Sequence, residues 1–186
     1  MVNGAVPEPD NPKPQRSESV VRLWARDLAI SAGVAVFIIL FLYQPVKVEG
    51  TSMLPGLQHE ERIFINKFVY RFESVNRGDV VVFRYPRDTA KSYIKRVVGV
   101  PGDRVRIQDG KVYLNGQQLA ETYVPDEYTD HRTMREMVVP EDAYFLLGDH
   151  RNASNDSRDF GAVPRGFIYG KAVFVYWPVE KVGLLE

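Results

Sequence analysis

The sequence predicts a mostly β protein, in which antiparallel sheets fold into a barrel-like domain with a small β insertion, preceded by one N-terminal transmembrane helix. Three observations support this fold class. Residues 28–43 form an apolar run without a charged side chain, short β-branched and aromatic runs follow down to residue 177, and turns rich in Gly, Pro, Asn and Asp separate those runs. Strands at short, even spacing with such turns are typical of antiparallel sheets that close or fold on themselves.

The N-terminal region is predicted to consist of a tail and an anchor. Residues 1–23 are expected to be a disordered cytoplasmic tail, because the prolines and polar residues at its beginning bury too little apolar surface to offset chain entropy. Residues 24–43 are expected to form the transmembrane helix. The uncharged run is shorter than the ~20 residues that span a bilayer, but Trp24 to Asp27 extend it, with the Arg26 side chain reaching toward the interface.

Two alternatives remain for this apolar run. It could be a buried core helix or the apolar part of a cleavable signal peptide, although no small-x-small cleavage pattern follows it. If the run is an anchor, the arginines that precede it predict that the N-terminus lies in the cytoplasm and the bulk of the chain outside.

The region after the anchor is predicted to divide into a main β domain, residues 44–102 and 140–186, and an insertion, residues 103–139. The expected strands of the main domain are residues 62–70, 79–85, 92–100, 143–147 and 170–177. The insertion contains Asp109-Gly110 between two β runs, which is a strong hairpin signal because a type I′ turn needs positive φ at both central residues.

Composition excludes several classes of function. With 24 basic and 24 acidic residues the net charge is zero, so no nucleic-acid footprint is expected. The chain has no cysteine, which excludes disulfides and a thiol nucleophile, and its three histidines lie far apart in the sequence. We therefore expect no metal and no cofactor.

Two residues are candidates for catalysis. Ser52 lies in a Gly-Thr-Ser segment, and a serine hydroxyl needs an adjacent base to act as a nucleophile. Lys95 shares one face of a predicted strand with Tyr93 and Val97, and burial there would lower its pKa so that it could serve as that base. The residues alone leave two plainer readings open, a serine in an ordinary turn and a lysine that protects a strand edge.

Four segments, in order, resemble the motifs of the bacterial type I signal peptidase (leader peptidase) family, a family of Ser-Lys proteases. Residues 52–55 read Ser-Met-Leu-Pro against Ser-Met-x-Pro, and residues 77–81 match a Gly-Asp-hydrophobic motif. Residues 93–103 match the lysine motif almost residue for residue. Residues 148–158 resemble Gly-Asp-Asn-Arg-x-x-Ser-x-Asp-Ser-Arg. Together the motifs cover the chain from residue 45 onward.

The resemblance implies a membrane-anchored serine endopeptidase that removes signal peptides from secreted preproteins through an acyl-enzyme. Ser52 Oγ would attack the scissile carbonyl, and neutral Lys95 would take its proton. Implied partners are a lipid bilayer and secretory preproteins with small residues at the first and third positions before the cleaved bond. The chain would be a monomeric, single-pass protein of the plasma membrane, with its catalytic domain on the extracytoplasmic side.

The resemblance also implies roles around the dyad. The implied supporting residues are Tyr93, Arg96, Asp149, Ser154, Asp156 and Arg158. Ser154 would hydrogen-bond the lysine amine, Tyr93 would pack on the lysine stem, and Asp156 would pair with Arg158 to fix the last motif. The backbone N–H of Ser52 would be one oxyanion donor.

Two departures from the family pattern leave questions open. Some relatives carry a serine hydroxyl in the oxyanion hole two residues before the nucleophile, where this chain has Gly50. His150 replaces the usual asparagine, which raises the alternative of a Ser52–His150–Asp triad. Phe160, Phe167 and Trp177 could form an apolar rim against lipid or simply pack in the core.

Two other functions remain as alternatives. The chain could be a specialised processing peptidase of the same superfamily, or a non-catalytic, membrane-anchored β module.

Overall fold

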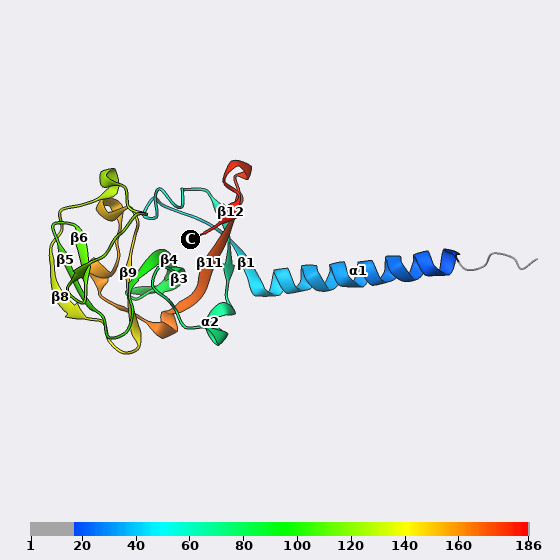
Figure 1. Cartoon of the computed structure of the whole chain (residues 1–186), viewed down its shortest axis with the longest axis horizontal. Helices are drawn as coiled ribbons and strands as arrows, with labels where there is room; N and C mark the ends of the chain where they lie inside the picture. Colours follow the sequence, from blue (N-terminus) through cyan, green and yellow to red (C-terminus); the bar gives the residue numbers. More distant parts are fainter. Residues whose placement is uncertain (1–16, 186) are drawn as a thin grey trace, which may run out of the picture. The chain divides into compact units, whose positions relative to one another are not determined.

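The computed structural model describes residues 17–185, without the side chains of residues 17–19 and 38–40, and comprises two compact units, residues 1–41 and 42–186 (Figure 1). Most of the predicted disordered tail, residues 1–16, lies outside the described residues. Helix α1 (Ser17–Leu42) begins earlier than predicted, so residues 17–23 are helical. The last proline of the tail is Pro14, and the next one is Pro45, so no proline interrupts a helix over residues 17–42.

The predicted transmembrane helix over residues 24–43 differs from the observed helix in both its bounds and its apolar character. Within residues 17–185, no helix combines the length and the apolar character needed to cross a membrane. Helix α1 contains residues 24–42, whereas Tyr43 already belongs to the first strand.

The unit from residue 42 onward is mostly β, as predicted, and its larger sheet has eight strands. They are β1 (Tyr43–Lys47), β2 (Arg62–Asn66), β3 (Val80–Tyr85), β4 (Asp88–Gly99), β9 (Ala143–Leu147), β10 (Val163–Pro164), β11 (Ile168–Trp177) and β12 (Gly183–Leu184). The order is β1-β2-β11-β3-β4-β9-β10, with β12 also on β11, and each pair is antiparallel.

The predicted barrel-like closure is not found. Among the described strands, β1 and β10 stand at the two ends of the order and do not pair. Strand β10 is two residues long and ends at Pro164, which has no N–H to extend a ladder. Register shifts in β4 and β11 bend the sheet without closing it.

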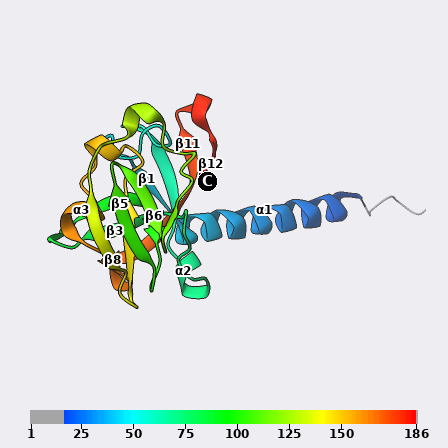
Figure 2. The ribbon, with the colours of Figure 1, turned by 60° about the vertical axis from the view of Figure 1, so that its left-hand side comes forward.

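A second sheet lies within the segment predicted to be an insertion. Its order is β7-β6-β5-β8, and its strands are β5 (Arg104–Gln108), β6 (Lys111–Leu114), β7 (Gln117–Gln118) and β8 (Met134–Val138). Figure 2 shows β5, β6 and β8 running alongside one another. Short helices connect the strands of both sheets: α2 (Val69–Phe72), η1 (Asp126–Tyr128), η2 (Arg151–Ala153), α3 (Ser157–Phe160), η3 (Arg165–Phe167) and η4 (Val179–Lys181).

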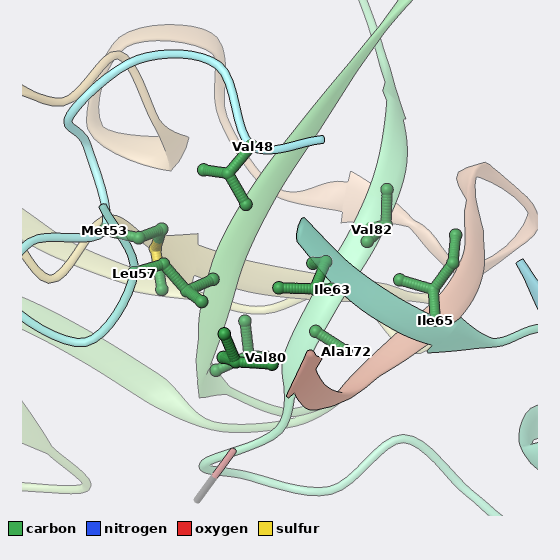
Figure 3. Packing of buried hydrophobic residues seen from close by; sticks show 9 residues of the cluster. Val48, Met53, Leu57, Ile63, Ile65, Val80, Val82 and Ala172 are labelled. Atoms are coloured by element: carbon green, nitrogen blue, oxygen red, sulfur yellow. The ribbon is translucent and has the colours of Figure 1, made fainter. Parts of the chain in front are cut away.

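Buried side chains form three apolar clusters, of which one supports the loop between β1 and β2. Val48, Met53 and Leu57 come from this loop and pack with Ile63 and Val80 of the sheet (Figure 3). Because these side chains are almost completely buried, the loop is held on the sheet at three points.

Candidate active site

Ser52 lies in the loop between β1 and β2, directly before the buried side chain of Met53. The loop is also held by hydrogen bonds, since the Leu57 N–H donates to the Met53 carbonyl (2.8 Å) and the Gly50 N–H donates to His59 Nδ1 (3.1 Å). Gly50 has a φ of +96°, a conformation that side chains rarely adopt. This backbone explains why position 50 carries glycine and not the serine of some relatives.

Lys95 approaches Ser52 from β4. Its Nζ donates a 2.6 Å hydrogen bond to Ser52 Oγ and a 2.9 Å bond to the Ile94 carbonyl. The lysine is 3% exposed, and its Nζ lies 5.5 Å from the centre of the Tyr93 ring. The structure thus brings together two residues that are 43 positions apart in the sequence.

The environment of Lys95 favours its neutral form. Burial lowers its pKa from 10.5 to about 8, and the charge of Arg158 acts in the same direction. The carboxylates of Asp156 and Asp149 oppose this shift. A lysine with this pKa is partly neutral near neutral pH and can accept a proton from a hydroxyl.

A cleft of about 530 Å³ opens beside the dyad. One wall is formed by residues 46–52 and the other by residues 92–95, with Tyr169 and Val82 among the remaining lining residues. Strand β4 pairs with β3 from Asp88 to Arg96 but with β9 only from Arg96 onward. The part of β4 that faces the cleft therefore has an open edge.

The last motif packs directly on the nucleophile loop. The His150 N–H donates to the Ser52 carbonyl (3.1 Å), and a methyl group at Gly148 would fall 2.5 Å from the same oxygen. Ser154 Oγ is buried and has no hydrogen-bond partner among the described residues. The implied bond from Ser154 to the lysine amine is therefore not formed, because Lys95 Nζ is directed at Ser52 Oγ and the Ile94 carbonyl.

Two buried ion pairs lie behind the dyad, of which the resemblance implied only the pair of Asp156 with Arg158. Arg96 binds Asp149 through two nitrogens (3.0 and 2.9 Å), and Arg158 binds Asp156 in the same way (2.8 and 2.7 Å). Burial raises the pKa of Asp149, although the Arg96 guanidinium opposes this shift. Such two-point pairs fix the orientation of both side chains.

His150 does not take the position of a catalytic base. Its Nδ1 lies 3.0 Å from the Thr51 carbonyl, and its ring packs edge-on against Tyr128 at 4.4 Å. The hydroxyl of Ser52 is instead bonded by Lys95. The geometry therefore gives no support to the triad with His150.

The remaining candidates separate clearly. The Ser52 N–H donates to no described acceptor, which leaves it able to bind an oxyanion.

Phe160 and Phe167 pack against a buried cluster, so they belong to the core, whereas Trp177 is 52% exposed. Among residues 17–185, no group of three or more His, Asp or Glu side chains could hold a metal ion.

Comparison with known proteins decides the family. The family model described as "Signal peptidase, peptidase S26" matches residues 21–177. The chain belongs to this family. It is 36% identical over 193 residues to the probable signal peptidase I-2 of Synechocystis sp. (strain ATCC 27184 / PCC 6803 / Kazusa), covering all of this chain and 86% of the relative. It is 34% identical to the signal peptidase I of Leptolyngbya laminosa, covering 96% of each chain.

Further relatives include signal peptidase I T of Bacillus subtilis (strain 168), which is 34% identical and covers 86% of each chain. Among solved structures, a signal peptidase I from Enterococcus faecalis V583 is 34% identical, with a TM-score of 0.46, and the match covers 53% of this chain and 97% of that one. The family model and the curated relatives confirm the resemblance inferred from the four motifs.

Sequence reasoning missed one set of contacts in this S26 peptidase. Glu121 binds Arg151, and Asp130 binds Arg158, so two acidic residues of the irregular segment after β7 hold two arginines of the last motif. No motif contains these acids. The last motif holds two arginines and two aspartates, so its own charge balance gave no signal of these acids.

Proposed function

We propose that this chain removes signal peptides from secreted preproteins with Ser52 as the nucleophile and Lys95 as the general base. Membership of its family makes it a serine endopeptidase of the signal peptidase I type. The residue assignment rests on one observation, the 2.6 Å hydrogen bond between Lys95 Nζ and Ser52 Oγ in a buried setting.

In the proposed reaction, neutral Lys95 takes the proton of Ser52 Oγ as that oxygen attacks the scissile carbonyl. The Ser52 N–H stabilises the negative charge on the carbonyl oxygen. The amine of the mature protein leaves with a proton from Lys95, and the signal peptide stays on Ser52 as an ester. Lys95 then takes a proton from a water molecule, whose oxygen attacks the ester. Lys95 returns that proton to the departing Ser52 Oγ, which releases the signal peptide and restores both residues.

The open edge of β4 supports a mode of substrate binding. An extended peptide could pair with this edge through main-chain hydrogen bonds, and alternate side chains would enter the cleft. Ile63, Val82 and Tyr169 line the cleft, and we expect their bulk to leave room only for small side chains near the cleaved bond. We therefore propose that small residues precede the cleavage site.

Helix α1 is proposed to anchor the enzyme at the plasma membrane. Its large apolar side chains are exposed, including Trp24, Leu28, Phe37 and Phe41. A helix that is apolar around its circumference is typical of one surrounded by lipid. Arg22 and Arg26 precede its uncharged part, which supports a cytoplasmic N-terminus and a catalytic unit on the extracytoplasmic side.

Cleavage of a purified secretory preprotein in detergent tests the proposal. The full chain should cut once at the signal junction, and Ser52→Ala and Lys95→Ala should both be inactive, whereas His150→Ala should retain activity. Residual cutting by Lys95→Ala, or a loss in His150→Ala as complete as in Lys95→Ala, would refute the Ser-Lys assignment. Failure of a serine-reactive probe to label Ser52 in the wild type would instead favour a non-catalytic module.

A further inference from the structure

A second cavity of about 530 Å³ carries four positive charges and no negative one. Lys67, Arg71, Arg84 and Arg165 line it, and none of the described residues in its wall is acidic. Three of these cations are exposed, while Arg165 is partly buried. Like charges gathered around one cavity repel one another, so this arrangement favours an anion between them.

The four cations are not neutralised by neighbouring carboxylates. None of them forms an ion pair with a described residue. The acidic groups near Arg84 in sequence have other partners, since Asp79 binds Lys171 (2.6 Å) and the Tyr70 hydroxyl (2.9 Å), and Asp88 binds Lys91 (3.0 Å). Glu73 lies two residues from Arg71 and forms no ion pair with any of the four cations among the described residues. The charge of the cavity is therefore available to a ligand.

Arg165 is held in place before any ligand arrives. Its Nη2 donates to the Tyr70 carbonyl (2.7 Å), its Nη1 donates to the Ile168 carbonyl (3.2 Å), and its guanidinium lies 5.4 Å from the centre of the Tyr70 ring. A fixed guanidinium with exposed cations around it suits the tetrahedral oxygens of a phosphate group.

The position of the cavity indicates the source of the phosphate. Gln44 lines it and lies only two residues beyond Leu42, the end of α1, a span of roughly 7 Å in an extended chain. Phe72 follows Arg71 on α2 and is 86% exposed. An exposed aromatic beside cations is typical of a surface that meets lipid headgroups.

We propose that this cavity binds the phosphate of an anionic phospholipid headgroup. The proposal rests on the proposed membrane anchoring by α1. Ser92 and Tyr169 line both this cavity and the cleft beside Ser52. A lipid held here therefore orients the mouth of the cleft toward the bilayer from which a signal peptide emerges.

The test is native mass spectrometry of the full chain released from neutral detergent with phosphatidylglycerol or phosphatidylcholine. The wild type should retain one phosphatidylglycerol in preference to phosphatidylcholine. Because each cation near an anionic headgroup contributes roughly a fivefold factor in binding, Arg71→Gln/Arg84→Gln should weaken retention roughly 25-fold. Lys111→Gln/Arg135→Gln removes two exposed charges from the smaller sheet and should bind like the wild type.

Further arms separate the alternatives. Arg71→Lys/Arg84→Lys keeps both charges and should retain the lipid, which excludes misfolding as the cause of the loss. Equal retention by the glutamine variant and the wild type would overturn the proposal. Displacement of the lipid by millimolar inorganic phosphate would show a site for a free anion, and displacement by an acidic preprotein would show a substrate site; either result also overturns it.

Preprotein cleavage by the same samples separates this proposal from the proposed function. In neutral detergent without lipid, the glutamine variant should cut within about twofold of the wild type. A chain that cuts but shows no preference for phosphatidylglycerol refutes only the lipid site. A chain that retains phosphatidylglycerol but never cuts refutes only the peptidase.

Discussion

At the scale of single residues, the dyad combines a functional need with a cost in stability. Lys95 is buried, and burial lowers its pKa to about 8. The same burial penalises the ammonium form, which predominates at neutral pH. The burial that lets Lys95 accept a proton therefore also destabilises the fold, and such a stability–activity trade-off is common at active sites.

The pH dependence of cleavage should follow the proton on Lys95. Only the neutral amine can act as base, so kcat/KM should rise with pH through an inflection near 8 and then level off. Initial rates on a synthetic signal-peptide substrate would measure this profile. Lys95→Arg, which stays charged throughout, should be inactive at every pH. A profile that is flat between pH 6 and 9 would contradict the assignment.

Lys95→Met should increase the free energy of unfolding at pH 7 by roughly 1–3 kcal/mol, because it removes a buried charge. The pKa is lower in the folded state than the ordinary 10.5, so the unfolded chain binds the proton more tightly. The stability of the wild type should therefore rise between pH 8 and 10.5, and its deficit relative to Lys95→Met should shrink. Urea unfolding at pH 7 and pH 10 would measure both values. A variant less stable than the wild type at pH 7 would contradict this reasoning.

At the scale of elements, the last motif and the nucleophile loop form one packed unit through Gly148. A methyl group there would meet Ser154 Oγ and the Ser52 carbonyl, and the latter cannot move without moving the nucleophile. Gly148→Ala should cost about 1–3 kcal/mol of stability by overpacking and lower kcat at least tenfold. Gly166→Ala is the control, because no atom lies within 4 Å of the added methyl group. Equal activity of the two variants would show that the contact with Ser52 is unimportant.

Some elements were predictable because their signals are local. The hairpin turn at Asp109-Gly110 was predicted from its residue types, and both residues have positive φ. Strand β3 was predicted one residue too long at its start. Strand β1 was missed, because its residues are mostly polar and include Pro45; it forms through pairing with β2, and its place at the sheet edge tolerates a proline.

In the candidate site, the residues within the motifs were predictable, whereas their partners outside the motifs were not. The dyad and the pair of Asp156 with Arg158 followed from motifs, since their residues lie within the recognised segments. The partners Glu121 and Asp130 lie 30 and 28 positions from their arginines, outside any motif. That Ser154 Oγ is buried without a hydrogen-bond partner depends on how the neighbouring side chains pack, which no sequence pattern encodes.

At the scale of the whole catalytic unit, the smaller sheet is connected to the active site by a chain of contacts. The turn at Gly110 packs against Asp130, Asp130 binds Arg158, and Arg158 binds Asp156. Asp156 Oδ2 then accepts a hydrogen bond from the Gly148 N–H (3.1 Å), directly beside the Ser52 carbonyl. The segment after β7 thus supports the site without contributing a reacting group.

Two glycine substitutions in the smaller sheet should distinguish the effect of disturbing the contact with Asp130 from the effect of backbone strain alone. Gly110 and Gly116 both have positive φ, so alanine at either position should cost about 1 kcal/mol. A methyl group at Gly110 would also overlap the Asp130 carbonyl, whereas a methyl group at Gly116 would have no atom within 4 Å. Gly110→Ala should therefore lower both Tm and kcat/KM for preprotein cleavage, while Gly116→Ala lowers Tm alone. If both variants cleave equally well, the smaller sheet does not support the dyad through Asp130, and its contacts with the last motif serve stability only.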